Sequence, residues 1–127
     1  MIETIVVGTD GSDTAEAAVL RAGELAQSTG ASLHIVCAHG GAVPPDITSA
    51  LLDRSAGVLH SRGIASECHA RQGDAAEALL TVAEQEDADV IVVGNRGMHG
   101  NRRFLLGSVP DKVSHHAACS VLIVRTT

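Results

Sequence analysis

A glycine-rich loop that contains several arginines carries the clearest chemical signal in the sequence. It spans residues 94–108 and joins an apolar segment to a segment of helical period. Glycines let backbone N–H groups approach an anion closely. Three of the nine basic residues lie in this loop although the formal net charge of the chain is -6, namely Arg96, Arg102 and Arg103. This combination favours binding of a polyphosphate.

The end of the loop is expected to place a helix beside that anion. Ser108 is followed three positions later by the acidic Asp111, a spacing similar to that of a capping box. We therefore expect Ser108 to cap the helix, so that the positive end of the helix dipole lies next to the loop. The alternative is that the glycines only turn the chain and the arginines form a solvated surface.

Strand and helix patterns alternate along the chain and would position this loop. Five apolar, β-branched segments are predicted strands, at residues 2–8, 32–38, 64–70, 90–94 and 120–125. Helical periodicity predicts helices near residues 12–28, 46–62, 74–86 and 109–117. Ser12 is the expected N-cap of the first helix, and Gly30 its end. The alternation predicts a doubly wound α/β fold with a mostly parallel sheet and functional loops at its carboxyl edge.

The loop spacing resembles that of a known family. Gly94-x2-Gly97-x9-Gly107-Ser108 matches the Gly-x2-Gly-x9-Gly-(Ser/Thr) signature of the ATP-binding branch of the universal stress protein family, whereas the P-loop and GxGxxG patterns are absent. The resemblance covers essentially the whole chain, from IVVGTDGS at residues 5–12 to ACSVLIV at residues 118–124. It implies one domain over residues 1–127, a three-layer Rossmann-like fold with five parallel strands in the order 3-2-1-4-5, and ATP, with or without Mg²⁺, between strands one and four.

The resemblance assigns three residues to the nucleoside end of the site. Asp10, preceded by Thr9, resembles the family's acidic residue at the end of strand one, and Val36 resembles a position whose backbone meets adenine. A carboxylate accepts hydrogen bonds from a ribose hydroxyl or an adenine amino group but repels phosphate. The alternatives are an Asx turn before Ser12 for Asp10, and a core position for Val36.

The resemblance assigns the triphosphate to the loop, where backbone N–H groups and the Ser108 hydroxyl would make the contacts. Arg96 falls between the first two glycines and would add positive charge or face solvent. Pro110 removes one N–H group from the first helical turn but is compatible with a helix start. The residues that match the family's phosphate positions are Gly94, Gly97, Gly107, Ser108 and Val109.

The seven histidines do not predict a metal site. The adjacent His115 and His116 point about 100° apart on a helix and cannot easily converge on one ion, so a favourable position at a helix C-terminus explains them better. His39 and His99 are candidates to border the cleft. The remaining histidines are expected at the surface or at element edges.

Composition limits the classes of partner and the compartment. An acidic chain of 127 residues would be repelled by nucleic acids and by anionic lipid, and no apolar run approaches the length of a membrane span. Without the basic N-terminal region of a signal peptide, the chain is expected in the cytoplasm. Its three cysteines are expected to be reduced packing thiols.

Three functions remain open at this stage. The first is an adenine-nucleotide-dependent regulatory protein of the stress response with an unidentified protein partner. The second is a slow ATPase or a phosphoryl- or adenylyl-transferase, although no catalytic series of nucleophile, base and acid stands out. The third is a ligand-free dimeric scaffold. The resemblance implies homodimers that commonly pair through the last strand, where Val121 and Ile123 would make the interface.

Overall fold

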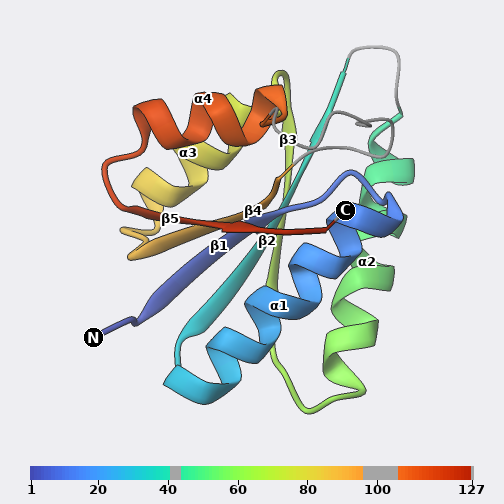
Figure 1. Cartoon of the computed structure of the whole chain (residues 1–127). Helices are drawn as coiled ribbons and strands as arrows, with labels where there is room; N and C mark the ends of the chain where they lie inside the picture. Colours follow the sequence, from blue (N-terminus) through green and yellow to red (C-terminus); the bar gives the residue numbers. More distant parts are fainter. Residues whose placement is uncertain (41–43, 96–105, 127) are drawn as a thin grey trace.

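A computed structural model shows a parallel sheet with helices on both faces (Figure 1). It describes residues 1–40, 44–95 and 106–126. Strands and helices alternate from the first element to the last. In chain order they are β1 (Thr4–Gly8), α1 (Asp13–Thr29), β2 (Ser32–His39), α2 (Pro45–His60), β3 (Glu67–Gln72), α3 (Ala75–Gln85), β4 (Val90–Gly94), α4 (Ser108–His116) and β5 (Ser120–Val124).

The strand order is β3-β2-β1-β4-β5, and every pairing is parallel, which confirms the predicted fold class. The order reverses between β1 and β4, because the chain moves from β1 to β2 on one side and returns to β4 on the other. Such a reversal opens a crevice at the carboxyl ends of the two central strands.

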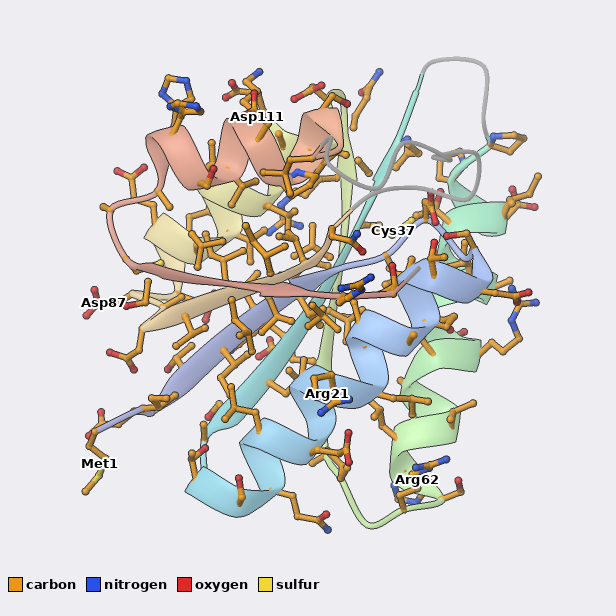
Figure 2. All side chains as sticks on the ribbon, viewed as in Figure 1. Met1, Arg21, Cys37, Arg62, Asp87 and Asp111 are labelled. Atoms are coloured by element: carbon orange, nitrogen blue, oxygen red, sulfur yellow. The ribbon has the colours of Figure 1, made fainter. Side chains whose placement is uncertain are left out.

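Each face of the sheet packs against its own pair of helices. On one face, Ile5 and Val7 of β1 pack with α1 and α2. On the other face, Val6 packs with α3 and α4. Because successive strand residues point to opposite faces, a strand covered on both sides must be apolar at every position. The central strands meet this requirement, and the result is three layers of helix, sheet and helix (Figure 1), with side chains between the layers (Figure 2).

The first helix begins and ends where the sequence indicates. Ser12 is the N-cap, and its side chain accepts a hydrogen bond from the Ala15 N–H group. Gly30 is the C-cap in the left-handed conformation, at φ 74°, which glycine adopts without a Cβ penalty. Both predictions are confirmed.

The third strand begins at Glu67, later than the sequence pattern indicates. Ile64 belongs instead to the turn that ends α2: its N–H group bonds to the Leu59 carbonyl, and Gly63 has a φ of 78°. The Ile64 side chain is only 7% exposed and joins the core beneath α1 and α2. The strand was predicted too early because Ile64 is apolar and follows a glycine that ends a helix.

The fourth helix also begins differently. Gly107 is its N-cap and Ser108 its first residue, and within the part of the chain that the structure describes no side chain caps this end. The prediction that Ser108 caps the helix together with Asp111 is therefore wrong by one position. The backbone bond from Asp111 N–H to the Gly107 carbonyl closes the first turn. His115 and His116 lie in the last turn, as expected.

None of the helices within the described residues is both long and apolar enough to cross a bilayer.

Candidate functional site

A pocket lies at the carboxyl edge of the sheet, between the ends of β1 and β4. Its lining comes from the loop after β1, the end of β2, the end of β4 and the first turns of three helices. The residues around it are Gly8, Thr9, Asp10, Ser12, Thr14, Ala15, Val36, Ala38, Ala75, Leu79, Val93, Gly94, Val109 and Pro110. The pocket thus occupies the position that the strand order predicts for a ligand.

Two sides of the pocket differ in chemistry. Val36, Ala38, Leu79 and Val93 form an apolar wall that would accept a flat aromatic ring. Asp10 adds the carboxylate, and it is exposed at the end of the β1 loop. Pockets that combine an apolar lining with a few polar groups are typical of small-molecule sites.

A buried hydrogen-bond network fixes the β1 loop. The Thr9 hydroxyl donates to Glu16 Oε2 at 3.0 Å and accepts from the Gly11 N–H group at 3.1 Å. Ser55 of α2 donates to the other oxygen of Glu16 at 2.6 Å. Thr9 and Ser55 are 8% and 1% exposed and Glu16 is partly buried, so the network is largely shielded from water. Loss of any member leaves a partly buried polar group without its partner.

Asp10 is held within this loop. Its Oδ1 atom accepts the Ser12 N–H group at 2.9 Å, which is the Asx turn considered from the sequence. The residue also lines the pocket, so the turn and a binding role are compatible. The Thr9 N–H group bonds to the Val36 carbonyl at 2.9 Å and ties the β1 loop to the end of β2.

The N-terminal ends of three helices reach the pocket, since Ser12 before α1, Ala75 of α3 and Val109 of α4 are among its lining residues. The partial positive charge of a helix N-terminus attracts anions. Side chains already cap two of these ends, since Ser12 caps α1 and Asp74 caps α3. Among the described residues, none caps the N-terminus of α4 with its side chain, so it is the end best suited to an external anion.

Asn95 links the two ends of the glycine-rich loop to the sheet. Its backbone carbonyl accepts the Gly107 N–H group at 2.8 Å, and its own N–H group bonds to the Val124 carbonyl at 2.8 Å. Its side-chain oxygen accepts from Thr126 N–H and Oγ1 at 2.9 and 3.0 Å. The start of α4 is therefore held against the ends of β4 and β5.

The structure brings most of the described candidate residues together. Five of them line the pocket: Thr9, Asp10, Val36, Gly94 and Val109. Gly107 and Ser108 form the start of α4 beside Val109 but are not among the lining residues. The other predicted positions lie outside the described residues: Arg96, Gly97, His99, Arg102 and Arg103.

Sequence reasoning missed the residues that support this site. Glu16 lies in α1 and Ser55 in α2. Both residue types occur in many helices, so neither stood out in the sequence. Asn95 sits next to Arg96 in the loop and carries no separate signal. A polar residue at a core-facing helical position, such as Ser55, was the one available indication.

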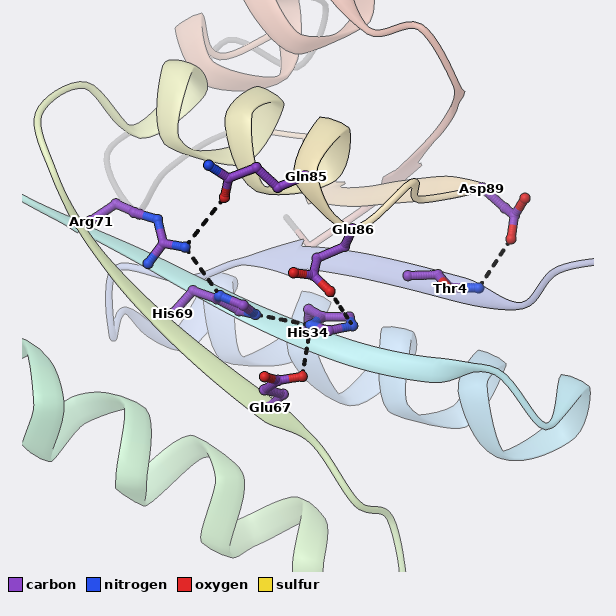
Figure 3. Close-up of polar contacts among 8 residues, drawn as sticks. All are labelled: Thr4, His34, Glu67, His69, Arg71, Gln85, Glu86 and Asp89. Atoms are coloured by element: carbon purple, nitrogen blue, oxygen red, sulfur yellow. Dashed lines mark hydrogen bonds and ion pairs between the residues drawn. The ribbon is translucent and has the colours of Figure 1, made fainter.

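The prediction that the remaining histidines lie at the surface is wrong for two of them. His34 of β2 and His69 of β3 are only 5% and 8% exposed, and their rings contact each other (Figure 3). The two strands are paired, and both side chains point to the face that α3 covers. The sequence pattern could not predict this burial, because the pattern of one strand does not show which residue of a neighbouring strand will contact its histidine.

The comparison with known sequences identifies the family. The sequence model of the universal stress protein family matches residues 1–125. The chain belongs to the universal stress protein family. A universal stress protein of Mycobacterium tuberculosis (strain H37Rv) is 36% identical over 148 residues, and the alignment covers 98% of this chain and 97% of that protein.

Solved structures of other universal stress proteins share the fold. A universal stress protein in complex with cAMP has a TM-score of 0.84 and 37% identity, with 99% of this chain and 98% of that chain covered. A universal stress protein from Archaeoglobus fulgidus in complex with dAMP has a TM-score of 0.78 and 27% identity, with 98% and 100% covered. The similarity thus extends over the full length of each protein.

Replacing Thr9 with valine tests the network behind the β1 loop in this universal stress protein. Thr9→Val keeps the side-chain shape but removes the hydroxyl, so Glu16 and the Gly11 N–H group lose a partner. We expect the free energy of unfolding to fall by about 1–3 kcal/mol, measured by urea denaturation.

The matched control is Thr81→Val at an exposed position of α3, which should change the stability by less than about 0.5 kcal/mol. Equal stability of Thr9→Val and the unchanged protein would contradict the role assigned to this hydroxyl.

Proposed function

We propose that this chain is an ATP-binding regulatory protein of the stress response, with the nucleotide held in the carboxyl-edge pocket. The observation that carries the proposal is the convergence of an apolar wall, the Asp10 carboxylate and the uncapped N-terminus of α4 around one pocket. An adenine nucleotide has matching parts: a flat base, a ribose with hydroxyl groups and a chain of anionic phosphates.

The base and ribose are assigned to the side of the pocket near β1 and β2. Val36 and Leu79 offer apolar contact to the ring, while Asp10 would accept a hydrogen bond from a ribose hydroxyl or the adenine amino group. Phosphate is disfavoured there because it would meet the Asp10 charge. The nucleoside is therefore assigned to the Asp10 side, and the phosphates extend away from Asp10.

The phosphates are assigned to the start of α4. Gly107 and Ser108 begin this helix, and its dipole favours an anion. The preceding loop supplies the sequence Gly94-x2-Gly97-x9-Gly107-Ser108 and three arginines, which suit more than one phosphate group. This arginine content is the reason for proposing a triphosphate rather than a monophosphate.

Related structures support an adenine nucleotide. Two universal stress proteins of the same fold were solved with cAMP and with dAMP, both of which contain adenine and a phosphate. Applied to this chain, those ligands favour the adenine specificity of the pocket. The choice of ATP rests on the loop of this chain.

A regulatory role is favoured over catalysis by the lining of the pocket. Asp10 is the one ionisable side chain among the described lining residues, and no nucleophile and base are paired there. The Ser12 hydroxyl already accepts the Ala15 N–H group as a helix cap. Binding without rapid turnover is the behaviour of a sensor, whose occupied state is recognised by a partner.

Substitutions at the two ends of the pocket separate the roles of base and phosphate. Gly97→Val should weaken ATP binding by roughly tenfold to a thousandfold, because a β-branched side chain prevents close approach of the backbone to phosphate. Adenosine binding should change little in that variant. Asp10→Ala should weaken ATP and adenosine binding by similar factors. Isothermal titration calorimetry with both ligands measures these effects.

Two control variants address changes in folding or charge. Gly57→Val places a side chain in open space on α2, and Asp53→Ala removes a carboxylate from the exposed surface of the same helix. Both should bind ATP as the unchanged protein does. If Gly97→Val keeps a native circular dichroism spectrum and full ATP affinity, the loop is not the phosphate site.

We further propose that the protein forms a homodimer through β5. This strand is at the edge of the sheet, and an unpaired edge favours association. Leu122 and Ile123 are 40% and 38% exposed, so apolar surface accompanies the open edge. Val121 is partly buried against the α3 and α4 face, which leaves Ile123 as the more accessible member of the predicted pair.

Replacing Ile123 with lysine tests this interface. Ile123→Lys places a charge at the edge and should shift the protein toward the monomer, as measured by sedimentation equilibrium. Ile47→Lys is the matched control, since Ile47 is 56% exposed on α2, away from β5, and its substitution should leave the mass unchanged. An unchanged mass for Ile123→Lys would exclude β5 as the interface.

A further inference from the structure

We propose that His34, His69 and Glu86 form a binding site for a divalent transition-metal ion such as Zn²⁺, separate from the nucleotide pocket. The three residues come from β2, β3 and the C-cap of α3. One nitrogen of each histidine and one carboxylate oxygen of Glu86 lie within 4.8 Å of one another. Imidazole and carboxylate are ligands that Zn²⁺ binds in proteins.

Strand register places the ligands on one face. His34 is directly opposite Glu67 on β3, and His69 follows two residues later on the same strand. Residues two apart on a strand share a face, so all three side chains lie on the side covered by α3. Glu86 reaches this group from the end of α3 (Figure 3). Residues far apart in the sequence thus converge on one point.

The distances are close to those of a coordination sphere. His34 Nδ1 lies 2.9 Å from His69 Nε2 and 3.5 Å from Glu67 Oε2. Two nitrogens on one tetrahedral Zn²⁺ ion, at about 2.0–2.1 Å each, are about 3.3 Å apart, so the rings need to separate by a few tenths of an ångström and to rotate until both lone pairs point at the ion. The carboxylate nearest His34 Nδ1 is that of Glu67, whereas Glu86 Oε1 lies 3.8 Å from Nε2 of the same ring and must turn to reach an ion at Nδ1.

To bind, the ion must replace the hydrogen bond between the two histidines and change the protonated nitrogen of His69. Arg71 Nη2 lies 3.4 Å from His69 Nδ1, and a guanidinium group can only donate, so the neutral His69 ring carries its proton on Nε2. That proton bridges to His34 Nδ1. On metal binding the proton of His69 moves to Nδ1, and the lone pairs of the two facing nitrogens bind the ion. Arg71 keeps its contact with Gln85 at 3.4 Å.

Charge and access favour a dication. Glu67 and Glu86 together balance two positive charges, and the C-terminal end of α3 adds the negative end of a helix dipole. A broad surface hollow reaches the cluster and is lined by His34, Ser66, Glu67 and Glu86, so an ion can enter from solvent.

The surroundings of His69 disfavour the charged form of its ring. Burial, followed by the charges of His34 and Arg71, lowers the pKa of His69 below 6.5, against the smaller opposing effects of Glu67 and Glu86. The His34 and His69 side chains are buried beside a core of valine, isoleucine and alanine. Two apolar residues at these positions would need no hydrogen-bond partners, whereas two buried histidines do.

Calorimetric titration with ZnCl₂ at pH 7.5 tests the site. We expect one Zn²⁺ per chain, with Mg²⁺ failing to bind there because it prefers oxygen ligands. Glu86→Gln, a conservative change at the partly exposed rim, should weaken Zn²⁺ binding at least about tenfold, and His69→Gln should weaken it further. Replacing Zn²⁺ with Co²⁺ should give the visible absorption of a tetrahedral nitrogen–oxygen site, and this band should be lost in His69→Gln.

Two control variants distinguish this site from other histidines and from general effects of charge. The double variant His115→Gln/His116→Gln removes an exposed pair at the end of α4 and should keep full affinity. Arg71→Gln removes the competing cation and should bind Zn²⁺ at least as tightly. The proposal is overturned if the folded protein binds no Zn²⁺, if Glu86→Gln and His69→Gln bind it unchanged, or if only the α4 double variant loses it.

Discussion

The pairing of β1 with β4 is the contact on which the proposed nucleotide site depends. Val6 lies beside Ile91, and Val7 beside Val92, and all four side chains are almost fully buried. The chain leaves β1 toward α1 on one face and leaves β4 toward α4 on the other. The helices therefore diverge at this point, and a crevice opens above the two strands. The packing of aliphatic side chains on β1 and β4 thus positions the pocket at the carboxyl edge of the sheet.

The two edges of the sheet carry opposite electrostatic character. At the carboxyl edge, the positive ends of α1, α3 and α4 surround the pocket, which suits an anionic ligand in an otherwise acidic protein. At the other edge, the negative end of α3 meets Glu67 and Glu86, which suits a cation. Strand β2 contributes to both, since Val36 lines the pocket and His34 lies two residues earlier on the same face.

The fold could be predicted because its signals are local or follow from the alternation of strands and helices, whereas the five pocket residues were assigned through the resemblance to the family. Ser12 and Gly30 mark a helix by contacts within a few residues. The errors have a different origin. Ser108 was placed one position off because a cap is decided by backbone geometry, and the His34–His69 contact depends on the pairing of two strands. The spacing of residues within one segment shows neither the backbone geometry of a helix cap nor the pairing of two strands.

The central claim is that an adenine nucleotide occupies the carboxyl-edge pocket, and mapping of backbone amide chemical shifts during titration with ATP tests it most directly. The account predicts the largest shifts at residues 8–12 and at 107–109, with little change at His34, Glu67 and Glu86 on the opposite edge. Saturable shifts confined to the opposite edge, or no shifts at all with a folded protein, would contradict it.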